Sequence, residues 1–412
     1  MHAKHMTALC LAATLAGVTA CGDSDEPQSA AGTAGGEKQV TIYSSQPLQG
    51  ATREQAVSVI NGEKLALEQH GGKGGDCRVK YVALDDSTAQ AAQWDPAAVS
   101  ANARKAIKDS AAVAYLGEFN SGASAVSLPI LNEVPLLQVS PSNTYVGLTK
   151  SEGAEPGEPE KYYPHGRRTY GRVVPADHVQ ATALVSYMKA KDATKLYILN
   201  DKEVYGAGIA RNVAAGAKAA GIAVLANEAI DTKAANYRSL AERIQSAGAD
   251  AFFFGGNTYG NAIQLWKDVY AANPDIKMFG PDGVAESTFF AKVGAPGRNT
   301  FITVSTLPPD RYPPAAREFF SAYESAYGKK PETYGIYGYE AMSVVLDAMK
   351  RAGDCTDREA VLEAFFATRD RESVLGTYSI DNDGDTTLTQ YGGYRIKDDE
   401  LVFDRVLEAK GL

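Results

Sequence analysis

From residue 40 onward, short apolar runs alternate with stretches in which apolar residues recur every three or four positions. The short runs, rich in β-branched and aliphatic residues, predict strands at 40–44, 79–84, 113–116 and 135–139. Between them the helical spacing predicts helices that include Val59 and Ile60, that cover 99–107, and that cover about 124–132. Such alternation is typical of a parallel sheet covered by helices on both faces.

The alternation stops between residues 145 and 170 and then starts again. Residues 151–159 are rich in Glu, Gly and Pro, which predicts a surface loop at the rim of a site. Further strands are predicted at 195–199, 223–226, 251–254 and 277–279, and further helices at 206–220, 240–244, 263–270, 314–326, 338–352 and 357–367. A final antiparallel pair is predicted from 376–380 and 391–396, turning at 381–384. The pattern as a whole predicts an α/β protein with two Rossmann-like lobes.

The first twenty residues have the pattern of a secretory signal peptide. A short basic start precedes an apolar run over 8–18, which is too short for a membrane span. Val18-Thr19-Ala20-Cys21 resembles a bacterial lipobox, which implies cleavage before Cys21 and a diacylglycerol on its sulfur; an ordinary signal peptide with an incidental cysteine is the alternative. Residues 21–38 are small and polar, as in a flexible tether. We therefore expect an extracytoplasmic protein, lipid-anchored to the outer face of the cytoplasmic membrane, or periplasmic where an outer membrane is present.

Composition narrows the function classes. With 41 basic and 50 acidic residues among 412, the chain has a formal net charge of −9, which argues against nucleic acid as a partner. The length is sufficient for two α/β lobes with cores of their own. Cys77 and Cys355 follow the predicted anchor site, and an oxidising compartment favours a disulfide between them. Two free thiols remain the alternative.

The loops that follow the predicted strands carry the candidate chemistry, because open parallel sheets bind ligands at the carboxyl ends of their strands. In the first lobe, 117–122 and 140–144 offer hydroxyls, an amide and the N–H groups of a helix start, which suit a carboxylate. In the second lobe, 200–206, 255–259 and 280–283 include a phenol and a carboxylate, which suit a cation. A zwitterion held between the lobes would satisfy both sets. Helix capping is the alternative role of the first-lobe hydroxyls.

Over about residues 40–410 the chain resembles the extracytoplasmic solute-binding proteins of branched-chain amino-acid-type ABC transporters, which have the type I periplasmic-binding fold. The matching stretches are Asn61-Gly62, Leu84-Asp85-Asp86, 117–122, 139–144, 201–206, 246–250 and 280–283. The resemblance implies that Ser121 and the Ser142-Asn143-Thr144 turn hold the ligand's α-carboxylate and help to hold its ammonium. It also implies that Tyr205 closes over the ligand and that Asp282 pairs with the ammonium.

The chain departs from this family at the side-chain end of the expected site. Asn257 stands where leucine-type binders have a tyrosine, so we expect it to contact a different ligand side chain. The resemblance further implies a division into an N-terminal lobe (39–174 and 308–375) and a C-terminal lobe (175–307 and 376–412) that close by a hinge. It implies a monomer that serves ABC permease subunits and reaches the membrane through its lipid, with no cofactor or metal.

Other readings of the sequence are weaker. Asp381-Asn382-Asp383-Gly384-Asp385 resembles the start of a calcium loop, but the glycine and glutamate that such a loop requires are absent, so a hairpin turn is predicted. After the predicted signal peptide, the sequence contains no histidine pair at metal-ligand spacing and no Gly-x-Ser-x-Gly elbow, so it gives no indication of an enzyme. The expected function is capture of an amino acid or similar zwitterion for uptake. The alternatives are a receptor module for membrane signalling, or binding of a short amide, urea or aromatic acid.

Five tyrosines are further candidates for a cleft, with packing in the core as the alternative. They are Tyr162, Tyr163, Tyr334, Tyr337 and Tyr339.

Overall fold

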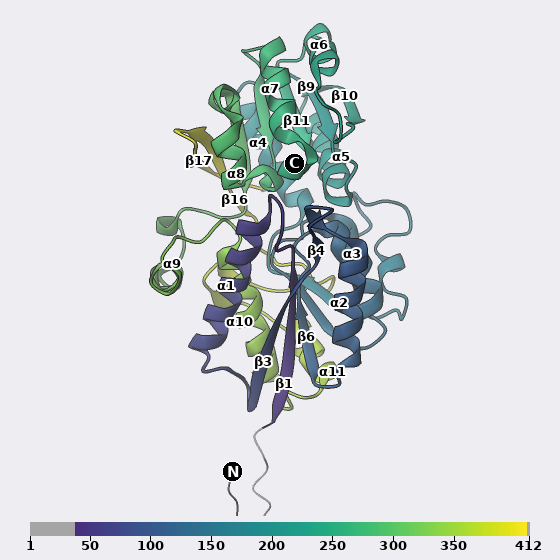
Figure 1. Ribbon diagram of the computed structural model, residues 1–412, viewed down its shortest axis with the longest axis vertical. Helices are drawn as coiled ribbons and strands as arrows, with labels where there is room; N and C mark the ends of the chain where they lie inside the picture. The colour runs from purple at the N-terminus through teal and green to yellow at the C-terminus, as the bar shows by residue number, and fades with distance from the viewer. Residues whose placement is uncertain (1–37, 410–412) are drawn as a thin grey trace, which may run out of the picture. The chain divides into compact units, whose positions relative to one another are not determined.

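The computed structural model describes residues 38–409, which contain two large sheets with helices packed against them (Figure 1). The predicted signal peptide, the predicted lipidation at Cys21 and the predicted tether up to residue 37 lie outside the described residues. Between residues 38 and 409, none of the helices combines the length and the apolar composition that crossing a bilayer requires.

The first sheet has the strand order β2-β3-β1-β6-β7-β8. Its strands are β1 (Gln39–Gln46), β2 (Lys73–Gly74), β3 (Cys77–Asp85), β6 (Ala112–Leu116), β7 (Leu137–Ser140) and β8 (Tyr170–Arg172). All neighbours are parallel except β2 and β3, which form a tight antiparallel pair. The central strands β1, β6 and β7 are buried almost along their whole length, as expected for a parallel sheet covered on both faces.

Helices cover both faces of this sheet. They are α1 (Arg53–Gln69), α2 (Pro96–Lys108), α3 (Ser121–Leu131), α9 (Pro314–Tyr327), α10 (Gly335–Arg351) and α11 (Arg358–Phe366). Figure 1 shows α1 and α10 on one side of β1 and β3, with α2 and α3 on the other. Glycines allow α1 and α10 to approach closely, because a Cβ at Gly62 would lie 2.1 Å from the carbonyl oxygen of Gly335. The helices α9, α10 and α11, which lie within residues 314–366, therefore pack with a sheet whose strands come from residues 39–172.

The second sheet has the order β10-β9-β11-β12-β13-β16-β17. Its strands are β9 (Lys195–Asn200), β10 (Ala223–Ala229), β11 (Ala251–Gly255), β12 (Lys277–Gly280), β13 (Thr300–Val304), β16 (Gln390–Lys397) and β17 (Glu400–Glu408). Its helices are α4 (Asp177–Ala190), α5 (Val204–Ala219), α6 (Arg238–Ser246), α7 (Ala262–Ala272) and α8 (Ser287–Val293). Trp266 is fully buried and meets Phe252, Phe254 and Phe289 edge-on, with ring centroids 5.2–5.9 Å apart.

The predicted pairing of 376–380 with 391–396 is wrong. Residues of β15 (Gly376–Tyr378) pair with β14 (Arg371–Ser373), whereas β16 pairs antiparallel with β13 and with β17. The turn itself is present, since the Gly384 N–H donates to the Asp381 carbonyl, but the bridge it closes joins only Ile380 and Thr386. The sequence pattern gave no strand at 300–304, and that strand supplies the partner that β16 takes.

The predicted lobe boundaries at 174/175, 307/308 and 375/376 remain a prediction. Tyr378 and Ile380 pack in the hydrophobic core of the first sheet, together with residues such as Ile42 and Phe365. The second small antiparallel pair, β4 (Ser87–Thr88) and β5 (Gln93–Trp94), lies in the loop that follows β3.

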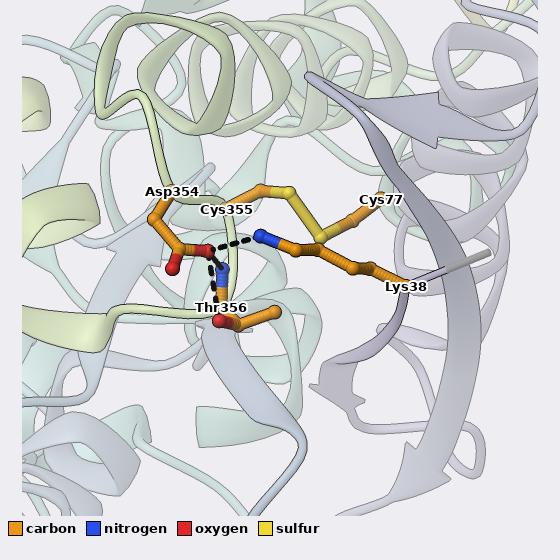
Figure 2. Close-up of a disulfide and its surroundings, with 5 residues drawn as sticks. All are labelled: Lys38, Cys77, Asp354, Cys355 and Thr356. Atoms are coloured by element: carbon orange, nitrogen blue, oxygen red, sulfur yellow. Dashed lines mark hydrogen bonds and ion pairs between the residues drawn. A yellow bond between two sulfur atoms is a disulfide. The ribbon is translucent and has the colours of Figure 1, made fainter. Parts of the chain in front are cut away.

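The structure joins Cys77 and Cys355 in a disulfide, with sulfurs 2.13 Å apart and Cα atoms 6.0 Å apart (Figure 2). The bond connects the start of β3 to the segment between α10 and α11. The two cysteines are 278 residues apart in the sequence. Beside it, Lys38 pairs with Asp354 at 3.1 Å, and the same carboxylate accepts hydrogen bonds from Thr356. Lys38, the first described residue, therefore contacts the segment between α10 and α11.

Candidate functional site

A narrow cavity of about 30 Å³ lies where loops from both sheets meet. Six of the seven predicted ligand-binding residues line it: Ser121, Ser142, Thr144, Tyr205, Asn257 and Asp282. The sequence analysis did not assign a ligand contact to the other lining residues, which are Gln55, Phe119, Asn120, Gly283, Glu286 and Tyr334. This volume is far below the range for small-molecule sites, so the walls lie close together in this conformation and must separate to admit a ligand.

Hydroxyls and a helix start from the first sheet form one wall. Ser121 is the first residue of α3, and the preceding residue, Asn120, makes no side-chain capping hydrogen bond. The Ser142 hydroxyl donates to the Phe119 carbonyl at 2.9 Å. The Thr144 hydroxyl is buried and has no hydrogen-bond partner among the described residues. Uncapped helix N–H groups beside a free hydroxyl make this wall a hydrogen-bond donor surface that suits an anion such as a carboxylate.

Asn143 is the predicted residue that does not line the cavity. Its side-chain oxygen accepts hydrogen bonds from the hydroxyls of Ser124 and Tyr170, and its amide nitrogen donates to the Phe119 carbonyl at 2.9 Å. All of these partners belong to the protein. Asn143 therefore braces the loop from within rather than facing the cavity.

The buried Arg172 holds the same loop from behind. Its guanidinium donates to the carbonyl oxygens of Asn143 and Tyr145 at 3.2 and 2.8 Å, on either side of Thr144. Its Nε donates to Asp385 at 2.7 Å, and the side chain is fully buried. Lys150 in turn pairs with the acidic turn that contains Asp385. The sequence gave no local signal for Arg172, because its partners are distant along the chain.

A carboxylate with two phenol donors forms the opposite wall. Asp282 lies in the 3₁₀ turn η4 (Asp282–Val284) that follows β12. One of its oxygens accepts from the Tyr205 hydroxyl at 2.8 Å, and the other accepts from the Tyr334 hydroxyl. Burial raises the pKa of Asp282, while the tyrosine hydrogen bonds oppose that rise. Tyr205 lies in the first turn of α5, beside the second sheet, and Tyr334 directly precedes α10, beside the first sheet. Side chains from both halves of the fold therefore donate to this carboxylate.

Two further buried carboxyl groups, Asp177 and Glu286, have raised pKa values near this wall. Neither oxygen of Asp177 has a hydrogen-bond partner in the described chain, and burial, reinforced by the charge of Asp282, raises its pKa to about 8. Glu286 lines the cavity with one oxygen unpartnered, and burial raises its pKa to about 7. Such groups are costly to bury without a partner, which makes the site receptive to a cation or a hydrogen-bond donor.

Direct contacts close the cavity across the two halves of the fold. The Gln55 amide donates to the Ala285 carbonyl at 3.0 Å, and the Asn120 amide donates to the Tyr259 hydroxyl at 3.3 Å. On another side, Arg211 of α5 pairs with Glu155 at 2.7 Å. The loop over 151–159, predicted at the rim of a site, contributes this outer contact, and none of its residues lines the cavity. The conformation is therefore a closed one.

Metal-ligating side chains and histidines were also located relative to the cavity. Over residues 38–409, no group of three or more His, Cys, Asp or Glu side chains is arranged to hold a metal ion. His70, His165 and His178 do not line the cavity. Of the five tyrosines singled out in the sequence, Tyr334 alone lines it; the others are absent from its wall.

Comparison with known proteins agrees with this architecture. The profile of the family described as "Periplasmic binding protein" matches residues 39–400. The Leu/Ile/Val-binding protein BraC3 of Rhizobium johnstonii is 28% identical over 367 residues, covering 88% of this chain and 93% of that protein.

Two solved structures illustrate the similarity of fold. A leucine-binding protein of Thermotoga maritima has a TM-score of 0.79 at 23% identity, covering 90% of this chain and 99% of the other. A solute-binding protein of an ABC transporter from R. palustris, solved with benzoate, has a TM-score of 0.74 at 18% identity, covering 90% and 96%. The predicted α/β class is confirmed, with two mostly parallel sheets flanked by helices.

Proposed function

Because the chain belongs to the periplasmic binding protein family, we propose that it captures a free amino acid or a similar small zwitterion for an ABC uptake transporter. The resemblance drawn from the loop motifs is confirmed by the family match and by the relatives. The family consists of solute-binding proteins rather than enzymes, and its members work outside the cytoplasm.

The observation that carries the proposal is the opposed chemistry of the two cavity walls. Ser121, Thr144 and the start of α3 suit a carboxylate, and Asp282, held by Tyr205, suits an ammonium. A zwitterion matches both walls at once. An aromatic acid such as the benzoate bound by the R. palustris relative would leave the buried carboxylate of Asp282 without a cation.

Capture would proceed by closure of the two halves around the ligand. Only contacts that exist in the closed state favour closure, and the bonds from Gln55 to Ala285 and from Asn120 to Tyr259 are of this kind. The permease would then meet the closed form. Since one chain supplies the whole cavity wall, a monomer is sufficient for binding.

We place the protein at the outer face of the cytoplasmic membrane through a lipid on Cys21. The sequence motif before Cys21 supports this placement, and residues 21–38 would serve as the tether. Cells fed an alkyne-labelled fatty acid should label the wild-type protein and leave a Cys21→Ala variant unlabelled. Equal labelling of the two proteins would remove the anchor from the proposal.

The transport role is tested by uptake of radiolabelled amino acids in cells that lack the gene. Uptake of one amino acid or a small group should fall and be restored by the wild-type gene, but not by a gene encoding Asp282→Asn. Unchanged uptake, together with ligand-dependent activity of a membrane kinase or chemoreceptor, would instead support the signalling role.

A further inference from the structure

The lining of the cavity contains no aliphatic side chain. No Leu, Ile, Val, Met or Ala is among the twelve residues that line it. Beyond the hydroxyl wall and Asp282, the lining consists of aromatic faces and the polar side chains of Gln55, Asn120, Asn257 and Glu286. An aliphatic group placed there would displace water from polar groups without replacing their hydrogen bonds, which is unfavourable.

Glu286 is the lining residue whose carboxyl group has a buried oxygen without a hydrogen bond. Its side chain lines the cavity, the residue is only 5% exposed, and its Oε2 makes no hydrogen bond among the described residues, although the hydroxyls of Thr52 and Thr258 lie close enough to oppose the rise in its pKa. It lies four residues after Asp282 on the same segment, just before α8. Above its pKa of about 7 the carboxylate is ionised and can only accept hydrogen bonds, so the complementary group on a ligand is a donor.

Asp282 does not compete for that donor. It is the carboxylate assigned to the α-ammonium, and each of its oxygens also accepts one tyrosine hydrogen bond. Glu286 therefore provides a second, separate acceptor in the same small cavity. The amides of Gln55 and Asn257 are also in the lining, but Gln55 already bonds Ala285 and Tyr334, and the Asn257 nitrogen already donates to the Tyr259 hydroxyl.

We propose that the ligand is a small amino acid whose side chain carries a hydrogen-bond donor (a hydroxyl, carboxamide or ammonium) that Glu286 accepts. This inference rests on the proposed function, because it takes the α-carboxylate and α-ammonium as bound by the walls already described. It separates this chain from the Rhizobium johnstonii relative, whose name gives Leu, Ile and Val as its ligands.

Three amino acids of nearly equal shape test the proposal on the wild-type protein. Asparagine has a donor, leucine has none, and aspartate has a second negative charge. Isothermal titration calorimetry should give asparagine at least about tenfold tighter binding than leucine, because a charged acceptor gains or loses about this factor with its donor. Aspartate should not bind measurably. 2,4-Diaminobutyrate distinguishes the donor type: tighter binding than asparagine indicates a cationic side chain, and weaker binding a neutral one.

Glu286→Met removes the acceptor and keeps the side-chain length. It should reduce the asparagine-to-leucine preference to near one, mainly by weakening asparagine. Glu332→Met is the matched control, because Glu332 is a nearby carboxylate that does not line the cavity; it should keep the wild-type preference. If leucine, isoleucine or valine binds wild type more tightly than asparagine and diaminobutyrate do, the donor proposal is wrong and the amino-acid function stands. If no amino acid binds at all, the proposed function itself fails.

Discussion

Asp282→Asn is the substitution that most directly probes the cation wall. The change keeps the shape of the side chain and removes its charge. A buried ammonium that loses its carboxylate partner costs about 3–5 kcal/mol, and each 1.4 kcal/mol is tenfold in affinity, so binding should weaken by at least about a hundredfold. One of the two tyrosines, Tyr205 or Tyr334, can still donate a hydrogen bond to the new amide oxygen, so the arrangement of this wall should persist.

The ligand-free protein should respond differently from the complex. Burial raises the pKa of Asp282, which means that the charged form is unfavourable in the empty cavity. Removing that charge should leave the free energy of unfolding within about 1–2 kcal/mol of wild type. Calorimetric titration gives the affinity, and urea unfolding of ligand-free protein gives the stability.

Glu63→Gln is the matched control for this experiment. Glu63 is likewise a fully buried carboxylate that accepts a tyrosine hydrogen bond, from Tyr81, and burial raises its pKa to about 8. It does not line the cavity. Affinity should stay within about threefold of wild type in this variant. If Asp282→Asn also binds within a few-fold of wild type, Asp282 does not pair with a ligand cation.

Three further predictions concern stability. Arg172→Met removes the nearest charged partner of the buried Asp385 carboxylate, which keeps Lys150 at 3.6 Å and the Thr149 hydroxyl, and should lower the free energy of unfolding by up to about 3–5 kcal/mol in urea; a loss below about 1 kcal/mol would contradict the bracing role. Replacing both Cys77 and Cys355 by Ser should cost about 2–5 kcal/mol with ligand affinity unchanged, as measured by unfolding and titration; equal stability would show that the bond constrains nothing. Burial raises the pKa of Asp177 to about 8 from 3.8, so the native state holds a proton that the unfolded chain releases; this stability is lost as pH rises toward 8. Melting temperatures measured from pH 5 to 8 should fall less steeply for Asp177→Asn, and parallel profiles would refute the assignment.

Much of the fold was predictable because its strands are buried apolar runs with helical spacing between them. The run at 251–254 became a central strand, as continuous burial requires. The pairing of 391–396 was not predictable, because a local pattern specifies that a segment is extended but not which edge it joins. That edge is β13, whose sequence Thr300–Val304 is a short buried strand that the pattern did not reveal.

The candidate site divides in the same way. Loops after parallel strands could be identified from sequence, and six of seven such residues lie around one cavity. Gln55 and Tyr334 come from α1 and from the residue before α10, and only tertiary packing brings them to the cavity. Glu286 follows a predicted loop by three residues and had no signal of its own.

The central claim, that the cavity holds a zwitterion, is tested most directly by a thermal-shift comparison of one amino acid with its two truncated analogues. The amino acid that binds most tightly would be compared with the matching acid without the α-amino group and the matching amine without the carboxylate. A ligand at a hundred times its Kd adds about 2.7 kcal/mol of stability, which is readily seen as a rise in Tm. The account predicts a rise with the amino acid and none with either analogue at the same concentration. An equal rise with the acid alone would contradict it.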